Sequence, residues 1–295
     1  MKTVQQSYPK LAEALQVPSL FLKREDLNPY GSHKGRSIPL MIKHYVKQGN
    51  IRSFAISSSG NAALAAAIAV QKHNQNNATH IQLTIFVGMH IDQKKQDALL
   101  PYLSNDITLI RHERPKQAAI QYEQQGNGKN LRQSTDELAL RGYYELANEL
   151  CGIPEVQAIF IPTSSGTTAE GIADSCIKQQ QAVQIHIVQT PTCAPLVSAL
   201  NPAAIVGDTT IPSLAGAIVD HVAHRKTTLI SKLQALQGNG WIAKNEEITQ
   251  AIALVKETTD ITLSPTSALS IVGVQQAVAA GYSWKGPVVC LITGP

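Results

Sequence analysis

Two short segments combine small hydroxyl residues with a glycine in a pattern that suits anion binding. Residues 57–61 read SSSGN, and residues 164–168 read SSGTT. Each segment follows an apolar run and precedes a helical pattern, so hydroxyls and backbone N–H groups would converge on a carboxylate or a phosphate. Ser and Asn are also the usual N-cap residues, so helix capping explains the first segment equally well.

The second segment differs from the known nucleotide-binding loops. It lacks the Gly-Lys-Ser/Thr ending of a P-loop, and its glycine spacing is not that of a dinucleotide fingerprint. The pattern therefore favours a phosphate over a whole nucleotide.

Lys34 and Thr293 are two further candidates for chemistry. Lys34 lies in the segment LKREDLNPYGSHKGRS, where Pro29 and Gly31 interrupt regular structure and the apolar run from Ile38 predicts a helix that begins just after the lysine. A lysine in such a place is most often a solvated surface residue. Thr293 ends the apolar run VVCLIT, which by itself indicates only a β-strand.

The elements that would position these residues alternate between strands and helices. This alternation is typical of βαβ units and predicts an α/β fold with parallel sheets. Strands are expected at residues 53–59, 81–88, 106–111, 156–162, 183–189 and 287–293. Helices are expected at 61–73, 92–103, 115–125, 135–150, after 166, at 246–258 and at 267–280. Ligands of such sheets bind beyond the carboxyl ends of the strands, where both hydroxyl segments and Thr293 fall.

A chain of 295 residues is long enough for two lobes. We expect a smaller, movable α/β domain at residues 41–133, inserted into a larger cofactor-binding domain formed by residues 1–40 and 134–295.

Composition argues against several classes of partner. The net charge is only +4, from 25 basic and 21 acidic residues, and no dense basic run occurs, so no nucleic-acid partner is expected. The four cysteines lie far apart in the sequence and are interpreted as small buried hydrophobes in a reducing compartment, not as a metal site or redox pair. No apolar run approaches the length of about 20 residues that a membrane helix needs, and no signal peptide is seen. We therefore expect a cytoplasmic protein without membrane contact.

Taken in order, four motifs resemble those of the fold type II pyridoxal-phosphate enzymes, the group of threonine synthase, tryptophan synthase β and cysteine synthase. The segments LKREDLNPYGSHKGR, SSSGN, SSGTT and LITG are similar to the family's lysine segment, asparagine loop, phosphate loop and C-terminal strand. The resemblance runs from about Leu22 to Gly294. It implies two open parallel-sheet lobes with the cofactor, pyridoxal 5'-phosphate, in a cleft between them.

The resemblance also implies a role for each motif residue. Lys34 would form a Schiff base with the cofactor and act as the base at the substrate α-carbon. Asn61 would bond the ring hydroxyl, and Thr293 would meet the pyridine nitrogen. The substrate carboxylate would be held by Ser58, Ser59 and Gly60. The cofactor phosphate would be held by Ser164, Ser165, Gly166, Thr167 and Thr168.

A neutral hydroxyl at the pyridine nitrogen implies elimination or replacement at the β or γ carbon of a small amino acid, in place of transamination. The lysine segment is nearest to threonine synthase-like members, and a homodimeric lyase or synthase is expected. The alternative is a non-catalytic relative that keeps the fold as a binding or regulatory module. Substrate identity depends on a few loop side chains and does not follow from these motifs.

Several positions depart from the family pattern and support that alternative. Gly35 follows the lysine where an acidic or amide residue is common, and Ala62 replaces a threonine after the asparagine. Ser164 and Thr167 stand where glycines are common, and the chain ends at Pro295 where relatives continue.

Four more polar residues either have an undecided role or are explained by ordinary solvation or helix capping. His33 could pack on the cofactor or could equally be a helix-start histidine. His221 and His224 have the spacing of one helix face but no third ligand, so they are interpreted as solvated residues and no metal is expected. Ser267 is expected to be the N-cap of its helix.

Overall fold

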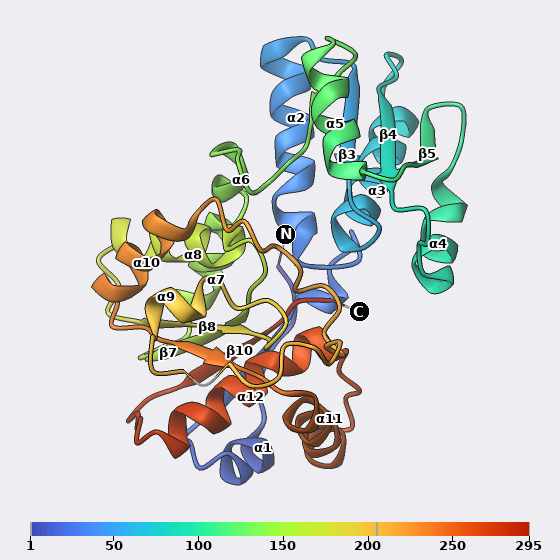
Figure 1. Ribbon diagram of the computed structural model, residues 1–295. Coiled ribbons are helices and arrows are strands. Elements are labelled where there is room, and N and C mark those ends of the chain that lie inside the picture. The colour runs from blue at the N-terminus through green and yellow to red at the C-terminus, as the bar shows by residue number, and fades with distance from the viewer. Residues whose placement is uncertain (1, 205, 295) are drawn as a thin grey trace. The chain divides into compact units, whose positions relative to one another are not determined.

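The protein forms two compact units in the computed structural model, which describes residues 2–204 and 206–294. Unit 1 comprises Met1–Leu27 with Tyr143–Pro295, and unit 2 comprises Asn28–Gly142 (Figure 1). The larger domain expected from the sequence also took in residues 28–40 and 134–142, which the structure groups with unit 2. The movement of the smaller domain stays a prediction, and the early end at Pro295 lies outside the described residues.

Unit 1 is built on a six-stranded sheet with the order β1-β2-β10-β7-β8-β9. Its strands are β1 (Gln5–Ser7), β2 (Leu20–Arg24), β7 (Ala158–Pro162), β8 (Gln184–Gln189), β9 (Gly240–Ile242) and β10 (Val288–Ile292). The edge strand β1 runs antiparallel to β2, whereas the other neighbouring pairs are parallel. The runs predicted at 156–162, 183–189 and 287–293 are thus confirmed as β7, β8 and β10.

Helices cover both faces of this sheet (Figure 1). One face packs on α1 (Pro9–Ala14), α11 (Asn245–Thr259) and α12 (Pro265–Ala279). The other packs on α7 (Tyr144–Cys151), α8 (Thr167–Lys178), α9 (Val197–Leu200) and α10 (Lys226–Ala235). Neighbours along a strand point to opposite faces, so Phe160 joins the first core and Ile159 the second. This two-sided burial explains why β7 and β10 are apolar throughout.

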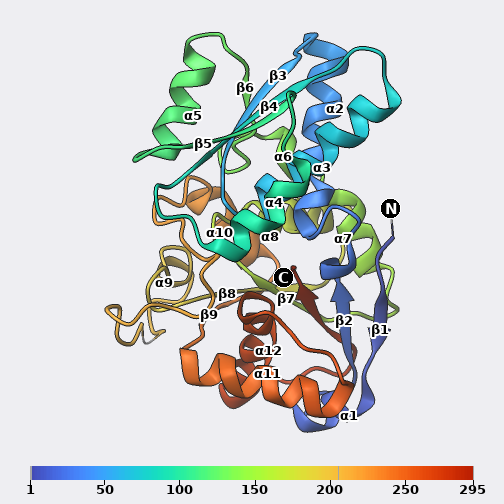
Figure 2. The same ribbon diagram turned by 90° about the vertical axis from the view of Figure 1, so that its right-hand side faces the viewer.

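Unit 2 contains a four-stranded parallel sheet with the order β5-β4-β3-β6. Its strands are β3 (Ser53–Ser57), β4 (Gln82–Val87), β5 (Ile107–Arg111) and β6 (Lys129–Asn130). Its α-helices are α2 (Ile38–Gly49), α3 (Asn61–Asn76), α4 (Gln93–Leu99), α5 (Pro115–Gln124) and α6 (Leu138–Arg141). Helices α2 and α3 share one core with the sheet, and α5 packs on the opposite face (Figure 2).

Short 3-10 helices occur at η1 (Glu25–Leu27), η2 (His33–Arg36) and η3 (Leu100–Tyr102). Lys34 therefore lies inside a 3-10 turn that precedes α2, and not just ahead of a continuous helix as expected.

The single helix expected at 135–150 is two helices, α6 and α7, separated at Gly142 and Tyr143. A Cβ on Gly142 would lie 2.3 Å from the Ser37 Cα, so the chain can pass there only as glycine. Ser37 also fixes this region, because its hydroxyl donates to the Ala139 carbonyl at 2.8 Å. The close approach of Gly142 to Ser37 is a long-range contact that helical periodicity does not reveal.

His186 lies at the centre of a buried aromatic cluster on β8. Its ring is fully buried and stacks on Phe160, with ring centroids 4.5 Å apart. The Trp241 indole N–H and the Asn239 backbone N–H both donate to His186 Nδ1, at 3.3 and 3.2 Å. Nε2 lies 3.2 Å from the Gln184 side-chain oxygen, so the contacts assign the proton to Nε2 of a neutral ring. Burial lowers the pKa of His186 to about 3.

This histidine should make the fold acid-sensitive. Because its pKa is depressed in the folded state, the unfolded chain takes up a proton first, and stability is lost as pH falls below about 6.5. The expected loss between pH 7 and pH 5 is about 2 kcal/mol of unfolding free energy. Urea unfolding at both pH values should show this loss in the wild type and a smaller one in His186→Gln. Equal losses in the two proteins would show that His186 does not cause it.

Candidate active site

The SSGTT segment forms the turn between β7 and α8 in unit 1. Gly166 is the N-cap of α8 and has a φ of +89°, a left-handed conformation that favours glycine. A Cβ there would also lie 2.8 Å from a methyl carbon of Leu229. Since glycine provides no side-chain cap, the first N–H groups of α8 face the position that an anion would take.

The hydroxyls of this turn have distinct contacts. Ser164 Oγ accepts hydrogen bonds from the backbone N–H groups of Val219 and Asp220, at 3.0 and 3.2 Å. Its hydroxyl therefore ties the turn to the loop before α10 and keeps one proton to donate. Ser165 and Thr167 share a hydrogen bond of 3.0 Å, and Thr168 is buried in the first turn of α8.

A buried carboxylate lies close to this helix start. Glu170, in the first turn of α8, is 2% exposed and pairs with Arg225 Nη1 at 3.2 Å and with Lys232 Nζ at 3.1 Å. An acidic group here would repel a bound anion, and the two cations offset that repulsion. The sequence did not point to Glu170 or Arg225, because their partnership joins residues 55 positions apart.

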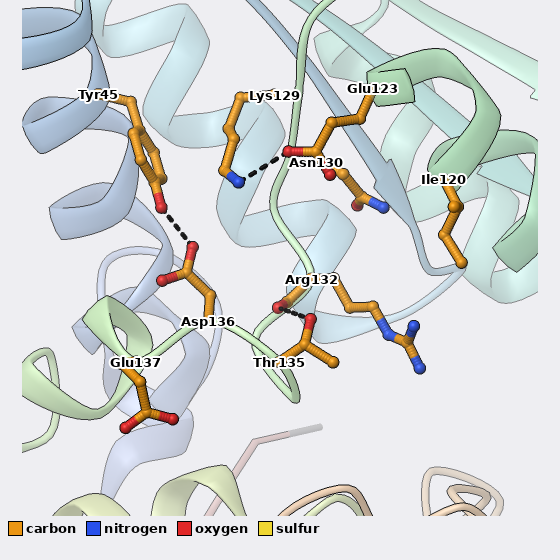
Figure 3. A pocket seen from close by; sticks show the side chains of 9 residues that line it. All are labelled: Tyr45, Ile120, Glu123, Lys129, Asn130, Arg132, Thr135, Asp136 and Glu137. Atoms are coloured by element: carbon orange, nitrogen blue, oxygen red, sulfur yellow. Dashed lines mark hydrogen bonds and ion pairs between the residues drawn. The ribbon is translucent and has the colours of Figure 1, made fainter. Parts of the chain in front are cut away.

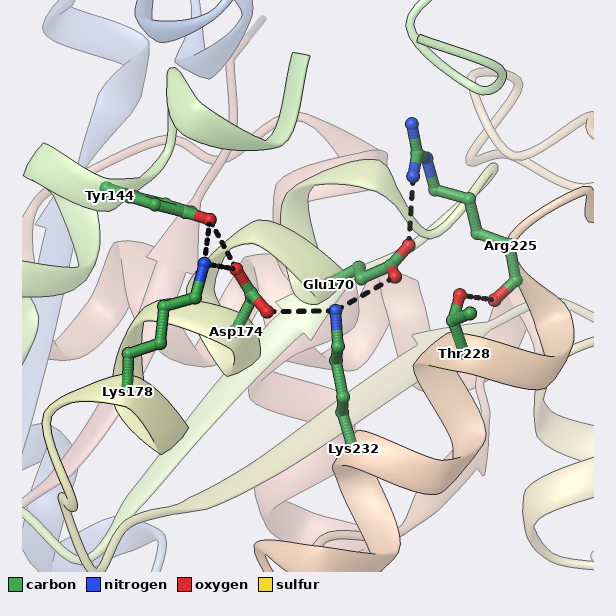
Figure 4. A network of polar contacts seen from close by, with 7 residues as sticks. All are labelled: Tyr144, Glu170, Asp174, Lys178, Arg225, Thr228 and Lys232. Carbon is green, nitrogen blue, oxygen red and sulfur yellow. Dashed lines mark hydrogen bonds and ion pairs between the residues drawn. The ribbon is translucent and has the colours of Figure 1, made fainter. Parts of the chain in front are cut away.

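The network continues along α8, as Figure 4 shows. Lys232 also bonds Asp174, which accepts hydrogen bonds from Lys178 and Tyr144. Partial burial alone would raise the pKa of Asp174, but these hydrogen bonds outweigh it and lower that pKa to about 2. Ion pairs of Lys232 thus link α8 to α10, and the hydrogen bond of the Tyr144 hydroxyl links α8 to α7.

Thr293 follows β10, the strand next to β7 in the sheet. Parallel neighbours end at one edge, so Thr293 and the turn after β7 lie at the same edge of unit 1. Ser264 and Ser267 both donate to the Gly294 carbonyl, at 2.6 and 2.9 Å, and so fix the backbone beside Thr293.

The expected N-cap at Ser267 is wrong: Ser264 caps α12, since its Oγ accepts from the Ser267 N–H. Pro265, at the first helical position, is the sequence signal for this cap.

Lys34 belongs to unit 2, where its turn packs against α3. Ser32 caps η2 by accepting from the Lys34 N–H at 3.3 Å. The departure at Gly35 has a steric reason, because a Cβ there would lie 2.3 Å from the Asn28 side-chain oxygen and 2.5 Å from the Tyr30 Cβ. Nothing in the structure explains Ala62.

The SSSGN segment closes β3 and opens α3, as expected. Gly60 is the N-cap of α3, and its N–H donates to Ser58 Oγ at 3.2 Å. Asn61 is the first helical residue. The lysine turn reaches the same helix, because Gly31 approaches Leu64 so closely that a Cβ on Gly31 would lie 2.7 Å from it.

The structure thus brings Lys34 and the SSSGN segment into unit 2, and the SSGTT turn and Thr293 into unit 1. Each unit by itself supplies a set of donors at the carboxyl ends of its strands. The turn before α8 fits a phosphate group in particular, because it combines a glycine N-cap with hydroxyl donors at a helix start.

Unit 2 also contains a cavity of about 340 Å³ (Figure 3). Its charged lining is largely paired internally, with Lys129 bonded to Glu123 and the Tyr45 hydroxyl bonded to Asp136. None of the motif residues lines it. We interpret it as a polar surface hollow, since it lies away from the motif residues.

His221 and His224 are exposed but do not lie on a helix, contrary to their spacing. In residues 2–204 and 206–294, no group of three or more His, Cys, Asp or Glu side chains could hold a metal ion. Over the same ranges, no helix is long and apolar enough to span a bilayer.

Comparison with known proteins identifies a family that matches almost the whole chain. The family described as pyridoxal-phosphate dependent enzyme matches residues 2–294. No curated protein gave a significant sequence match.

Several solved structures share the fold over nearly their whole length. The processed form of threonine deaminase isoform 2 from Solanum lycopersicum has a TM-score of 0.83 at 20% identity, covering 100% of this chain and 84% of that one. Maize serine racemase has a TM-score of 0.84 at 16% identity, with coverages of 100% and 88%. The O-acetylserine dependent cystathionine β-synthase from Helicobacter pylori has a TM-score of 0.78 at 16% identity, with coverages of 100% and 92%. With the family match over almost every residue, the chain belongs to the fold type II pyridoxal-phosphate-dependent enzymes, and pyridoxal phosphate is its cofactor.

Proposed function

We propose that the protein is a threonine synthase-like lyase or synthase that performs elimination or replacement at the β or γ carbon of a small amino acid. The observation that carries this proposal is the position of Thr293, a neutral hydroxyl residue. It lies at the same sheet edge as the SSGTT turn of residues 164–168, which we name the phosphate-type turn. The homodimer expected from the sequence is part of the proposal and is testable by analytical ultracentrifugation.

The residue at position 293 bears on the choice of reaction. When bound, pyridoxal phosphate withdraws electrons from the α-carbon of an attached amino acid, less strongly when its ring nitrogen carries no proton. The Thr293 hydroxyl has no charge with which to keep that nitrogen protonated. Reactions in which a leaving group carries away the excess charge are therefore favoured over transamination.

Lys34 would carry the cofactor and move the proton. Its Nζ would form the covalent attachment and, once the substrate displaces it, would remove the proton from the substrate α-carbon. A base must stay within hydrogen-bond reach of that proton. The Ser32 cap and the close packing at Gly31 and Gly35 support this role, because they fix the backbone that presents the lysine.

The two donor segments would orient the ligands. Ser58, Ser59 and Gly60 would hold the substrate carboxylate, and Asn61 would bond the cofactor ring hydroxyl. The turn from Ser164 to Thr168 would hold the phosphate through backbone N–H groups and hydroxyls. Charge-assisted hydrogen bonds of this kind contribute about 1.5 to 3 kcal/mol each.

Gly166 offers a test of the phosphate site that does not depend on turnover. Gly166→Ala should raise the dissociation constant for pyridoxal phosphate about 30-fold, equivalent to about 2 kcal/mol, because a Cβ at φ +89° is strained and would press on Leu229. Equilibrium dialysis of the apoprotein measures this. Gly216→Ala is the matched control, since a Cβ there meets nothing within 4 Å. An unchanged constant in Gly166→Ala would remove this turn from the site.

The reaction itself is tested with a panel of amino acids. O-acetylserine, O-phosphohomoserine and threonine are each mixed with the holoenzyme, and keto acids, amino-acid products, D-amino acids and pyridoxamine phosphate are quantified. We expect keto-acid or replacement products and little pyridoxamine phosphate. Efficient pyridoxamine phosphate formation would contradict the role of Thr293, D-amino acids alone would indicate a racemase, and no product from any substrate would favour the binding-module alternative.

Variants at position 293 test whether this residue sets the reaction type. Thr293→Ser keeps a neutral hydroxyl and should keep the product distribution. Thr293→Asp supplies a carboxylate and should increase the share of pyridoxamine phosphate. The same distribution in both variants would show that residue 293 does not set the reaction type.

A further inference from the structure

The structure brings two thiols together that are distant in the sequence. Cys151, the last residue of α7, and Cys176, in α8, have their sulfur atoms 3.3 Å apart. Their separation in the sequence predicts no close pair of cysteines, whereas the fold brings these two sulfur atoms into contact. The helical packing of α7 on α8 creates the contact.

Two polar contacts near the thiols hold the two helices in place. Gln179, just after α8, donates to the Asn148 side-chain oxygen on α7 at 2.7 Å. Nearer the start of α7, the Tyr144 hydroxyl bonds Asp174 of α8. The sulfur atoms are therefore kept close by polar contacts that do not involve sulfur.

The two thiols differ in exposure and in acidity. Cys176 is buried, whereas Cys151 is partly exposed. The hydrogen bond from Cys176 lowers the pKa of Cys151, while the hydrogen bond with Cys151, together with burial, raises the pKa of Cys176. A more acidic, accessible thiol beside a buried second thiol is the arrangement of an attacking and a resolving cysteine.

We propose that Cys151 and Cys176 form a site of reversible oxidation whose substrate is a peroxide. The Cys151 thiolate attacks one oxygen of hydrogen peroxide, the O–O bond breaks, and the released hydroxide takes up a proton as water, leaving a sulfenic acid on Cys151. The Cys176 sulfur then attacks the Cys151 sulfur, the S–O bond breaks, and hydroxide leaves with the Cys176 proton as a second water. Two thiols are oxidised to one disulfide, and one peroxide is reduced to two waters.

Little movement is needed for the second step. A disulfide bond is about 2.05 Å long, so the sulfur atoms must approach by roughly 1.3 Å from their present separation. The product would covalently join α7 to α8, the helix whose N-terminus forms the phosphate-type turn. This inference does not depend on which reaction the enzyme catalyses.

The test uses the purified holoenzyme treated with hydrogen peroxide. Alkylation of remaining thiols and mass mapping of a non-reducing digest should reveal one crosslinked peptide pair joining Cys151 to Cys176, and dithiothreitol should reverse it. Cys193→Ser, which changes a buried cysteine elsewhere in unit 1, should form the same crosslink. Absence of the crosslink at peroxide doses that oxidise methionines, or a crosslink through other cysteines, would overturn the proposal.

Single variants separate the two roles. In Cys176→Ser, the sulfenic acid on Cys151 has no resolving thiol, so its labelling by dimedone should rise at least about tenfold over wild type. In Cys151→Ser, Cys176 should stay unlabelled because it is buried. Dimedone on Cys176 in the Cys151→Ser protein would contradict the assignment of Cys151 as the attacking thiol. Cys151→Ala and Cys176→Ala give the same readouts if a serine variant fails to fold.

Discussion

Lys34→Ala is expected to lower turnover of every substrate of the enzyme by at least about a thousandfold, because one change removes both the covalent anchor of the cofactor and the base at the α-carbon. Initial rates on whichever amino acid of the panel reacts fastest measure this effect. Lys43→Ala is the matched control, since Lys43 is an exposed lysine on α2 in the same unit. It should retain wild-type turnover.

Circular dichroism and thermal unfolding must accompany this comparison, because a misfolded variant would also be inactive. Lys34 is only partly buried, so folding is expected to survive its replacement. A folded Lys34→Ala protein with turnover within tenfold of wild type would contradict the assignment.

Arg225→Met is expected to lower the free energy of unfolding by about 3 kcal/mol, because it leaves the buried Glu170 carboxylate with Lys232 as its remaining cationic partner. Cofactor affinity should fall as well, since the less compensated charge sits in the first turn of α8, beside the phosphate-type turn. Urea unfolding and equilibrium dialysis measure the two effects separately.

Two control variants identify the cause. Lys178→Met breaks an exposed ion pair of the same network and should leave the free energy of unfolding nearly unchanged. The double variant Arg225→Met with Glu170→Gln removes both charges of the buried pair and should recover most of the stability and the affinity. A double variant as weak in cofactor binding as Arg225→Met would show that Arg225 acts by some means other than compensating Glu170.

The strands that form the centre of each sheet were predictable from the sequence. Runs such as that of β7 are apolar at every position because helices cover both faces, and that composition is visible without a structure. Strand β2 was missed because it contains Lys23, a charged residue that is fully buried, where it pairs with Glu149 of α7 and donates to the Thr3 carbonyl.

The short motifs of the candidate site were predictable from the sequence, but the long-range contacts between them and other segments were not. Hydroxyls and glycines at strand ends follow from local sequence, and the turns before α3 and α8 form where they were expected. The link from Ser164 to residues 219 and 220 joins segments far apart in the sequence, as does the steric need for glycine at Gly142. The contact between Cys151 and Cys176 has the same character. Such features depend on packing, which local pattern does not encode.

The central claim, that this chain holds pyridoxal phosphate through Lys34, is tested most directly by chemical trapping. Holoenzyme is reduced with sodium borohydride, which makes the link between lysine and cofactor permanent, and is then digested and mapped by mass spectrometry. We expect the phosphopyridoxyl mass on the peptide that contains Lys34, and its loss in Lys34→Ala. The same mass on a peptide with a different lysine, or a protein that binds the cofactor with no lysine modified, would contradict the claim.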